Sequence, residues 1–215
     1  MMLPRREQLL YRLASDDTSS GGPLTYDRDA GTVEAVISMG SPVTREYGSE
    51  VLRIHPDAVD LSRLGEGGIP LLDHHKQDGI NSILGRAVDV WFERGALIGR
   101  FAFNKTPEGK KAEGMVARGE LAGVSAGYRV DRWEVTNADG KVVDPDKDRL
   151  RWDDDLTYTA TRWQLFEASL VGVPADAASS IRSLGSYNDE LTNVKARMAS
   201  RARMISRLGR LSDDG

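Results

Sequence analysis

The sequence predicts a strand-rich α+β domain, because strand patterns recur through the middle of the chain and one helix signal interrupts them. The helix signal lies at 106–119, and alternating or β-branched stretches lie at 33–39, 83–103, 121–136 and 157–171. With 215 residues, 40% hydrophobic and 29% charged, the chain can bury one substantial core but hardly two. We therefore expect one domain over residues 31–185, with an arm before it and a tail after it.

The N-terminal part of the chain changes from linker-like composition to strand periodicity at Gly31. Residues 1–30 mix charges with Ser, Gly and Asp, which predicts a flexible arm. The residues that follow alternate as in a half-buried strand, with apolar Val33, Ala35, Ile37 and Met39. The stretches 83–92 and 96–103 predict an antiparallel hairpin, because Gly95 between them can supply the positive φ of a tight turn.

One helix and two long strands are expected in the second half of the domain. Thr106 suits an N-cap and Pro107 the first position of a helix that ends near Gly119. In 121–136 the alternation places Ser125 and Gly127 on one face, opposite the apolar Val124, Ala126, Tyr128 and Val130. Residues 157–171 are rich in Thr, Tyr, Trp and Leu and predict a further strand, which Pro174 ends.

The C-terminal segment 186–215 has the periodicity of a basic amphipathic helix. Apolar residues recur at steps of three and four along one face: Leu191, Val194, Met198, Ala202, Ile205 and Leu208. Lys and Arg residues occupy the other faces. Such a helix can pack on the core with solvated arginines, or it can serve as a partner-binding or removable appendage. The pattern leaves both interpretations open.

Composition argues against several classes of function. The formal charge of −4 provides no basic footprint, so no specific nucleic-acid partner is expected. The absence of cysteine excludes disulfides, thiolate catalysis and cysteine-ligated zinc. No stretch has the length of a signal-peptide core or the roughly 20 apolar residues of a membrane span, so we expect a soluble intracellular protein without a membrane partner.

Ser125 is the candidate nucleophile because small residues surround it. In Gly123-Val124-Ser125-Ala126-Gly127 a substrate carbonyl could approach the backbone, although a serine in a glycine-punctuated strand edge is the structural alternative. The string matches the G-x-S-x-G turn of α/β-hydrolases, in which the histidine follows the serine. All three histidines precede Ser125 here: His55, His74 and His75. That fold is therefore excluded, whereas a triad with another chain order is not.

His74 and His75 are the candidate general bases, and Glu167 is their candidate partner. The two histidines follow the apolar residues 69–72, where a strand runs into a polar loop. In an extended segment neighbouring side chains point oppositely, so the two would not converge on one group, and the pattern does not choose between them. Glu167 lies in an otherwise apolar strand, where a carboxylate is costly unless it is paired, for example with an imidazolium. A surface position is the structural alternative for each.

No metal or other cofactor is expected. No zinc-like spacing appears in the cluster Asp73, His74, His75 and Asp78. Arg149 stands where a calcium loop needs a glycine at its sixth position, although acidic residues occupy positions 1, 3, 5 and 12: Asp144, Asp146, Asp148 and Asp155. A solvated acidic loop is the prediction for that stretch.

Together these segments resemble the prohead maturation protease family of tailed bacteriophages. The resemblance runs from Val33 to Ile181 through LLDHH, ILGRA, FAFN, a helix starting T-x-x-G, LAGVSAGY and FEASLVGVPADAAS, in that order. It implies that residues 31–185 are a serine protease domain. The implied fold is related to that of the herpesvirus assembly proteases, a small, mostly antiparallel β-barrel surrounded by helices.

The resemblance also implies a role for each candidate residue. Ser125 would be the nucleophile, Glu167 would orient the imidazole, and His74 would be the general base, because the family has its histidine directly after an L-x-polar step. His75 is the alternative base, since it stands where an aspartate is common. Backbone N–H groups near Ala126 and Gly127 would hold the oxyanion.

Substrates and partners follow from the same resemblance. The enzyme would cleave the scaffold segment of the major capsid protein and itself, acting as a homo-oligomer inside the assembling prohead in the host-cell cytoplasm. The helical tail would link it to the shell, and the connecting segment would be a self-cleavage region. Two alternatives are a catalytically silent capsid-assembly or scaffolding protein with the same fold, and an esterase on a β-rich scaffold.

Overall fold

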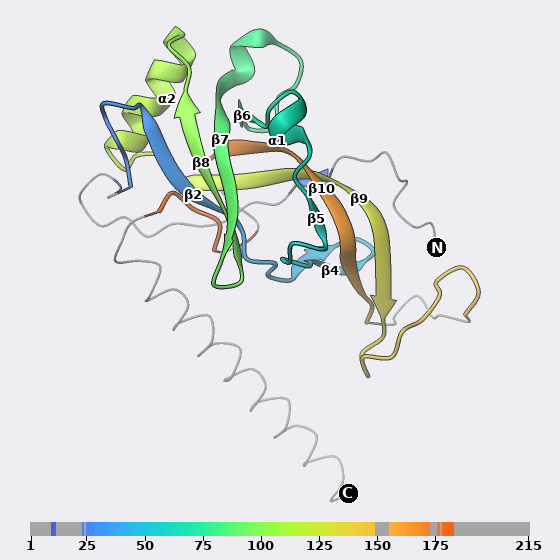
Figure 1. The fold of residues 1–215 in the computed structure, drawn as a ribbon. Coiled ribbons are helices and arrows are strands. Elements are labelled where there is room, and N and C mark those ends of the chain that lie inside the picture. The colour runs from blue at the N-terminus through green and yellow to red at the C-terminus, as the bar shows by residue number, and fades with distance from the viewer. Residues whose placement is uncertain are drawn as a thin grey trace, which may run out of the picture. The chain divides into compact units, whose positions relative to one another are not determined.

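A curled sheet of ten strands forms the framework of the protein in this computed structural model (Figure 1). The structure describes residues 10–11, 23, 25–148, 155–172, 176 and 178–182. The chain divides into two units, Met1–Arg182 and Ser183–Gly215, and the sheet belongs to the first. The predicted helical tail and most of the predicted N-terminal arm lie outside the described residues.

The strands follow the order β1-β9-β10-β6-β7-β8-β2 across the sheet, β4 and β5 also pair with β10, and β3 pairs with β4. Their bounds are Leu10–Tyr11 (β1), Thr32–Ser38 (β2), Val43–Arg45 (β3), Gly48–Leu52 (β4), Val59–Asp60 (β5), Pro70–Asp73 (β6), Ile83–Glu93 (β7), Ala96–Phe103 (β8), Gly123–Thr136 (β9) and Thr157–Val171 (β10). The helices in the described part are α1 (Arg63–Glu66), the short 3-10 turn η1 (Ile80–Ser82) and α2 (Pro107–Ala117).

The strands and the helix that sequence periodicity predicts between residues 33 and 171 are present. The hairpin β7–β8 pairs Glu93 with Ala96, and both residues of its turn have positive φ, Arg94 at 49° and Gly95 at 84°. Helix α2 begins at Pro107, and the Thr106 side chain caps it by accepting the Gly109 N–H at 3.1 Å. The prediction of a strand-rich α+β fold is therefore confirmed.

Two features differ from the predicted barrel. Strand β10 has parallel neighbours in β4, β5 and β6, in addition to its antiparallel partner β9. The described part contains few helices, so a surrounding layer of helices is not seen there. The relation to the herpesvirus assembly proteases stays a prediction.

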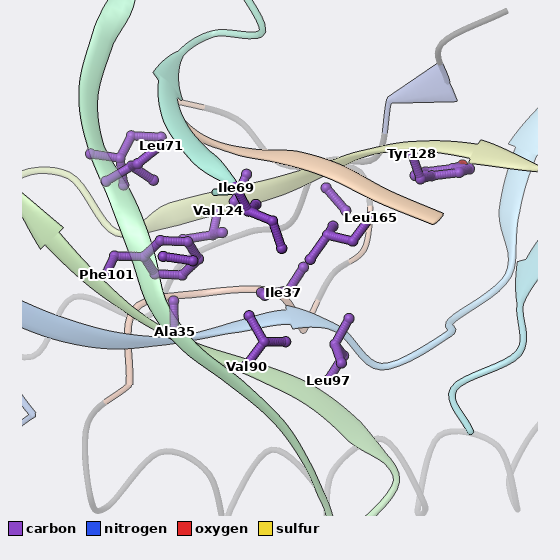
Figure 2. Close-up of a cluster of buried hydrophobic side chains, with 14 of the residues drawn as sticks. Ala35, Ile37, Ile69, Leu71, Val90, Leu97, Phe101, Val124, Tyr128 and Leu165 are labelled. Atoms are coloured by element: carbon purple, nitrogen blue, oxygen red, sulfur yellow. The ribbon is translucent and has the colours of Figure 1, made fainter. Parts of the chain in front are cut away.

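The core lies between the two arms of the curled sheet. Figure 2 shows side chains of β2, β7 and β8 facing those of β9, β10, β6 and Ile69, which directly precedes β6; the labelled ones are Ala35, Ile37, Ile69, Leu71, Val90, Leu97, Phe101, Val124, Tyr128 and Leu165. Burial of these apolar side chains is the main stabilising contribution to the fold. It also fixes the register of each strand, because a slip of one residue would turn its apolar side chains to solvent.

No helix in the described ranges is long and apolar enough to cross a membrane.

A buried carboxylate joins β4 to β9 at one end of this core. Glu50 is fully buried and accepts hydrogen bonds from Tyr128, from Tyr47 at 2.5 Å and from Arg45 at 3.2 Å. Burial, followed by the hydrogen bond to Glu50, raises the pKa of Tyr47, so this hydroxyl remains protonated. The Tyr128 ring packs edge-on against Trp163, with 5.7 Å between ring centroids. This cluster holds β9 in a fixed position.

Replacing Tyr128 with phenylalanine is expected to lower the free energy of unfolding by about 1.5–3 kcal/mol, because the buried Glu50 loses one hydrogen-bond donor while the ring packing is kept. Urea denaturation measures the change. Tyr26→Phe is the matched control, since the Tyr26 hydroxyl donates to Glu113 at 2.8 Å in a partly exposed position. The control should cost less than about 1 kcal/mol, and an equal cost at both sites would contradict the importance of the Glu50 cluster.

Candidate active site

A β-bulge in β10 brings Glu167 out of the core. Up to the bulge Trp163 and Leu165 point into the core, and beyond it Ala168 and Leu170 do. The register shifts between Leu165 and Glu167, so Phe166 is the extra residue. Without it, the alternation would place Glu167 on the core face with Leu165. The bulge therefore puts the carboxylate on the opposite face of the sheet.

Strand β9 contributes a serine and a glycine to this same face. Its apolar residues Val124, Ala126 and Tyr128 are fully buried in the core, as the alternation predicts. Ser125 pairs with Ser169 of β10, and Gly127 pairs with Glu167. Residues opposite each other in an antiparallel ladder have side chains on the same side. The face opposite the core therefore collects Ser125, Gly127, Glu167 and Ser169.

The histidines reach this face from the end of β6. Strand β6 runs parallel to β10, with Leu72 opposite Ser169 and Asp73 opposite Leu170. After Asp73 the chain turns, because His74 (φ 48°) and His75 (φ 60°) both adopt the left-handed conformation. This conformation costs roughly 1–2 kcal/mol per non-glycine residue, so surrounding contacts must hold it. One such contact is the His75 N–H, which donates to the Ser169 hydroxyl at 3.0 Å.

His75 and Glu167 form a buried pair. The Nδ1 atom of His75 lies 2.6 Å from Oε1 of Glu167, and the two side chains are 11% and 2% exposed. The other carboxylate oxygen, Oε2, accepts the Ser169 hydroxyl at 2.7 Å. An ionised carboxylate only accepts hydrogen bonds, so the tautomer of His75 that suits this contact carries its proton on Nδ1. In that tautomer the Nε2 atom has the free lone pair.

The Glu167 carboxylate packs directly against the backbone of Gly127. A Cβ atom on Gly127 would lie 2.0 Å from Oε1 and 2.6 Å from Cδ of Glu167. No side chain fits at that distance, so glycine is required by close approach rather than by its φ angle. The close contact with Glu167 explains why LAGVSAGY has a glycine after Ser125 and Ala126. An oxyanion role for Ala126 or Gly127 stays a prediction.

His74 lies apart from Glu167 and has other partners. Its side chain is 55% exposed, and its Nδ1 atom lies 2.6 Å from Oδ1 of Asp73. Its Nε2 atom accepts the backbone N–H of Gly172 at 3.2 Å. Partial burial acts to raise the pKa of Asp73, but hydrogen bonds from Lys76 and His74 hold it below its ordinary value. His74 thus forms hydrogen bonds with Asp73 and Gly172 at the surface, and the structure brings His75 to Glu167 instead.

The Ser125 hydroxyl lies on the same face as this pair. Ser125 is fully buried, and its Oγ has no hydrogen-bond partner among the described residues. Its neighbour across the ladder, Ser169, is the residue that bonds to both His75 and Glu167. A buried hydroxyl without a partner is costly in a folded protein, and a catalytic role is one of the explanations for such a group.

Two cavities flank the turn that carries the histidines. One of about 580 Å³ is lined by Leu72, Phe166, Glu167, Ile80 and Ile83, among others. The other, of about 430 Å³, is lined by His74, Leu84, Met115, Leu121 and Gly172, among others. Both cavities mix apolar with charged side chains in their lining, the first with Arg63, Lys76 and Asp78 and the second with Asp73, Lys111 and Glu120.

The acidic stretch and the histidine turn do not form a metal centre in the described residues, where no group of three or more His, Asp or Glu side chains could hold an ion. In the acidic stretch, Asp144 and Asp148 instead accept backbone N–H groups, Asp144 from Asp146 at 3.0 Å and Asp148 from Asp144 at 2.8 Å.

Ser169 and the bulge at Phe166 are the parts of the site that sequence reasoning missed. Ser169 stands two residues after Glu167, so period two places both on one face, and that signal could have identified it. The bulge has no comparable signal in FEASL.

Alanine in place of Ser169 is expected to lower the free energy of unfolding by about 1–3 kcal/mol, because the buried Glu167 loses one of its donors and the His75 N–H loses its acceptor. Ser179→Ala is the matched control: Ser179 is also buried, and its hydroxyl has no hydrogen-bond partner among the described residues. Chemical denaturation should show little change for the control. Equal losses for both variants would mean that the Ser169 hydrogen bonds contribute nothing.

The residue types gathered at this site, a serine, a histidine and a carboxylate, are those of serine hydrolases. The chain belongs to the family of Caudovirus prohead serine proteases, whose family model matches residues 29–195.

Two further comparisons found similar proteins. The chain is 30% identical over 154 residues to the major capsid protein of Halomonas phage phiHAP-1 (isolate from the Gulf of Mexico, 2001), a match that covers 71% of this chain and 23% of that protein. The chain thus spans about a quarter of the length of this relative. It also resembles the structure of the bacteriophage T4 capsid assembly protease, gp21, with a TM-score of 0.42 and 13% identity over 82% of this chain and 97% of that chain.

Proposed function

We propose that this chain is a serine endopeptidase of phage capsid maturation, with Ser125 as nucleophile, His75 as general base and Glu167 as the residue that positions the base. The observation that carries this proposal is the buried His75–Glu167 pair, which lies on the same sheet face as the Ser125 hydroxyl. Family membership supports the reaction type. The exposed position of His74 and its contact with Gly172 lead us to prefer His75 as the base.

The proposed reaction is acyl transfer in two steps. The Ser125 oxygen attacks the scissile carbonyl carbon while Nε2 of His75 takes the hydroxyl proton. The imidazolium that forms is stabilised by the adjacent carboxylate of Glu167. The C–N bond breaks as His75 returns the proton to the leaving amine. Water, activated by the same histidine, then hydrolyses the acyl-enzyme and restores the Ser125 hydroxyl.

The proposed substrates are capsid proteins, in particular the scaffold segment of the major capsid protein, and the chain itself. The relative named major capsid protein contains a stretch similar to this chain, which supports a close association between protease and capsid protein. We place the enzyme inside the assembling prohead in the host cell, as a homo-oligomer, and without a requirement for a cofactor.

An active-site probe and a cleavage assay test the proposal together. Wild type and Ser125→Ala are treated with a fluorophosphonate, which reacts with activated serines, and each is co-expressed with the phage's major capsid protein. Intact mass should show one adduct and processed capsid protein for wild type, and neither for Ser125→Ala. Ser179→Ala serves as the control variant and should behave as wild type. Labelling that persists without Ser125 would refute the assignment of the nucleophile.

The same assay separates the proposal from a catalytically silent assembly role, for which the match to a capsid protein is the favouring observation. A silent assembly protein would co-purify with the capsid protein, leave it uncut and not react with the probe. An esterase would react with the probe and turn over esters, but leave the capsid protein intact.

A further inference from the structure

The N-terminal strand β1 lies on the outer edge of β9, next to the candidate nucleophile. It pairs antiparallel with β9, with Leu10 opposite Tyr128 and Tyr11 opposite Gly127. Strand β10 lies on the other side of β9, where Glu167 is opposite Gly127. The backbone of Gly127 is therefore flanked by the proposed catalytic carboxylate on one side and by the chain's own N-terminal segment on the other.

The outer edge of β9 has the properties of a peptide-docking edge. An edge strand presents backbone N–H and C=O groups that can pair with an extended peptide. This edge is held in place, because Tyr128 is tied to the buried Glu50 and packs against Trp163. A rigid edge pairs with a peptide at little entropic cost to the protein.

The register of β1 leads to Ser125. Tyr11 lies opposite Gly127, and Ser125 is two residues further back along β9. Because the pairing is antiparallel, a peptide that continues this register runs from Gly127 toward Ser125. The peptide residue that lies across from Ser125 comes two positions after the one opposite Gly127. On the far side of Ser125 the edge is taken by the segment 178–182, which bridges Ser180 to Gly123. Ser125 thus lies between two occupied stretches of one edge.

We propose that the outer edge of β9 is where an extended peptide substrate docks, and that the N-terminal segment occupies this edge as an internal competitor through Leu10 and Tyr11. This inference rests on the proposed function, because it names the substrate-docking surface of that site. A strand of two residues forms a weak pairing, since short isolated pairings have marginal stability. A substrate peptide of capsid origin can therefore displace it, and the enzyme is restrained until such a peptide is present at high local concentration.

A binding experiment in an inactive background tests the competition. The probe is a labelled synthetic peptide with the sequence of residues 5–17, and the receptor is the full chain carrying Ser125→Ala, with and without the double change Leu10→Pro and Tyr11→Pro. Proline cannot donate a ladder hydrogen bond, so the double change removes the internal strand whichever of the two residues donates. Ser19→Pro, in the same N-terminal segment but outside β1, is the matched control.

The double-proline chain should bind the peptide at least tenfold more tightly than the parent and the Ser19→Pro chain do. Equal affinity for all three chains, or no binding to any of them, would overturn the proposal. If the double-proline chain fails to fold, Tyr11→Pro alone is used with the same expected direction. Because the assay measures binding without catalysis, it can succeed where proteolysis fails. Tighter binding together with an inactive wild type would refute the proposed function and leave the docking edge intact.

Discussion

Alanine in place of His75 is expected to lower the rate of peptide cleavage about 10³-fold or more, whereas alanine in place of His74 should leave the rate within about threefold of wild type. The two histidines are adjacent and both adopt the left-handed conformation, so the two variants are matched in residue type and backbone. The difference between them comes from their partners.

His75 has the arrangement that a general base requires. Its Nδ1 atom is held by the buried Glu167 at 2.6 Å, which restrains the ring orientation; in the proposed reaction the carboxylate would stabilise the positive charge that develops during proton transfer. In His74 the Nε2 atom accepts the Gly172 N–H at 3.2 Å. His74 could take up a proton at Nε2 only by giving up this hydrogen bond, and its Asp73 partner is at the surface.

The measurement is the initial rate of capsid-protein cleavage, with fluorophosphonate labelling as a second readout that needs no substrate. Both variants should be folded under the assay conditions, which a denaturation curve of each one checks. A difference in cleavage rate then cannot be attributed to loss of fold. His75→Gln is a useful third variant, because it keeps a hydrogen bond to Glu167 but cannot accept the proton, and it should be as inactive as His75→Ala. Loss of activity in His74→Ala, with His75→Ala active, would reverse the assignment of the base.

The fold could be predicted from the sequence where one periodicity held along a whole element. The hairpin β7–β8, helix α2 and the inward face of β9 follow directly from alternation, the Gly95 turn and the Thr106–Pro107 start signal. The parallel contacts of β10 with β4, β5 and β6 could not be predicted, because these partners are two to five residues long and their pairing is decided by tertiary packing.

The site could be predicted in its residue types but not in its geometry. The extended backbone expected after Leu72 did not choose between the histidines, and the family resemblance favoured His74; the structure ends β6 at Asp73 and turns through two left-handed residues. Glu167 was a candidate because a carboxylate is costly in an apolar strand, and the bulge at Phe166 turns it to the face where His75 and Ser169 are its hydrogen-bond partners. A bulge depends on the partner strand, so one strand's sequence does not reveal it.

Alanine in place of Gly127 is the second change with a large expected effect, a loss of about 3–5 kcal/mol in the free energy of unfolding and of most activity. The added Cβ would lie 2.0 Å from Oε1, 2.6 Å from Cδ and 2.8 Å from Cγ of Glu167. The carboxylate cannot move aside cheaply, because His75 and Ser169 hold both of its oxygens. It must either give up these hydrogen bonds in a buried position or force β9 and β10 apart.

A double-mutant cycle separates this contact from a general effect of alanine in a strand. Gly65→Ala, in helix α1, is a control for a glycine-to-alanine change without a clash, since nothing lies within 4 Å of a Cβ at Gly65, and it should change stability by less than about 1 kcal/mol. In the background Glu167→Ala the clashing atoms are gone, so Gly127→Ala should cost at least 2 kcal/mol less than in wild type, a coupling typical of residues in direct contact. Denaturation of the four proteins of the cycle measures the coupling. If Gly127→Ala lowered the free energy of unfolding equally in both backgrounds, the glycine would be needed for the backbone of β9 itself. The contact between Gly127 and the Glu167 carboxylate would then not be what positions His75.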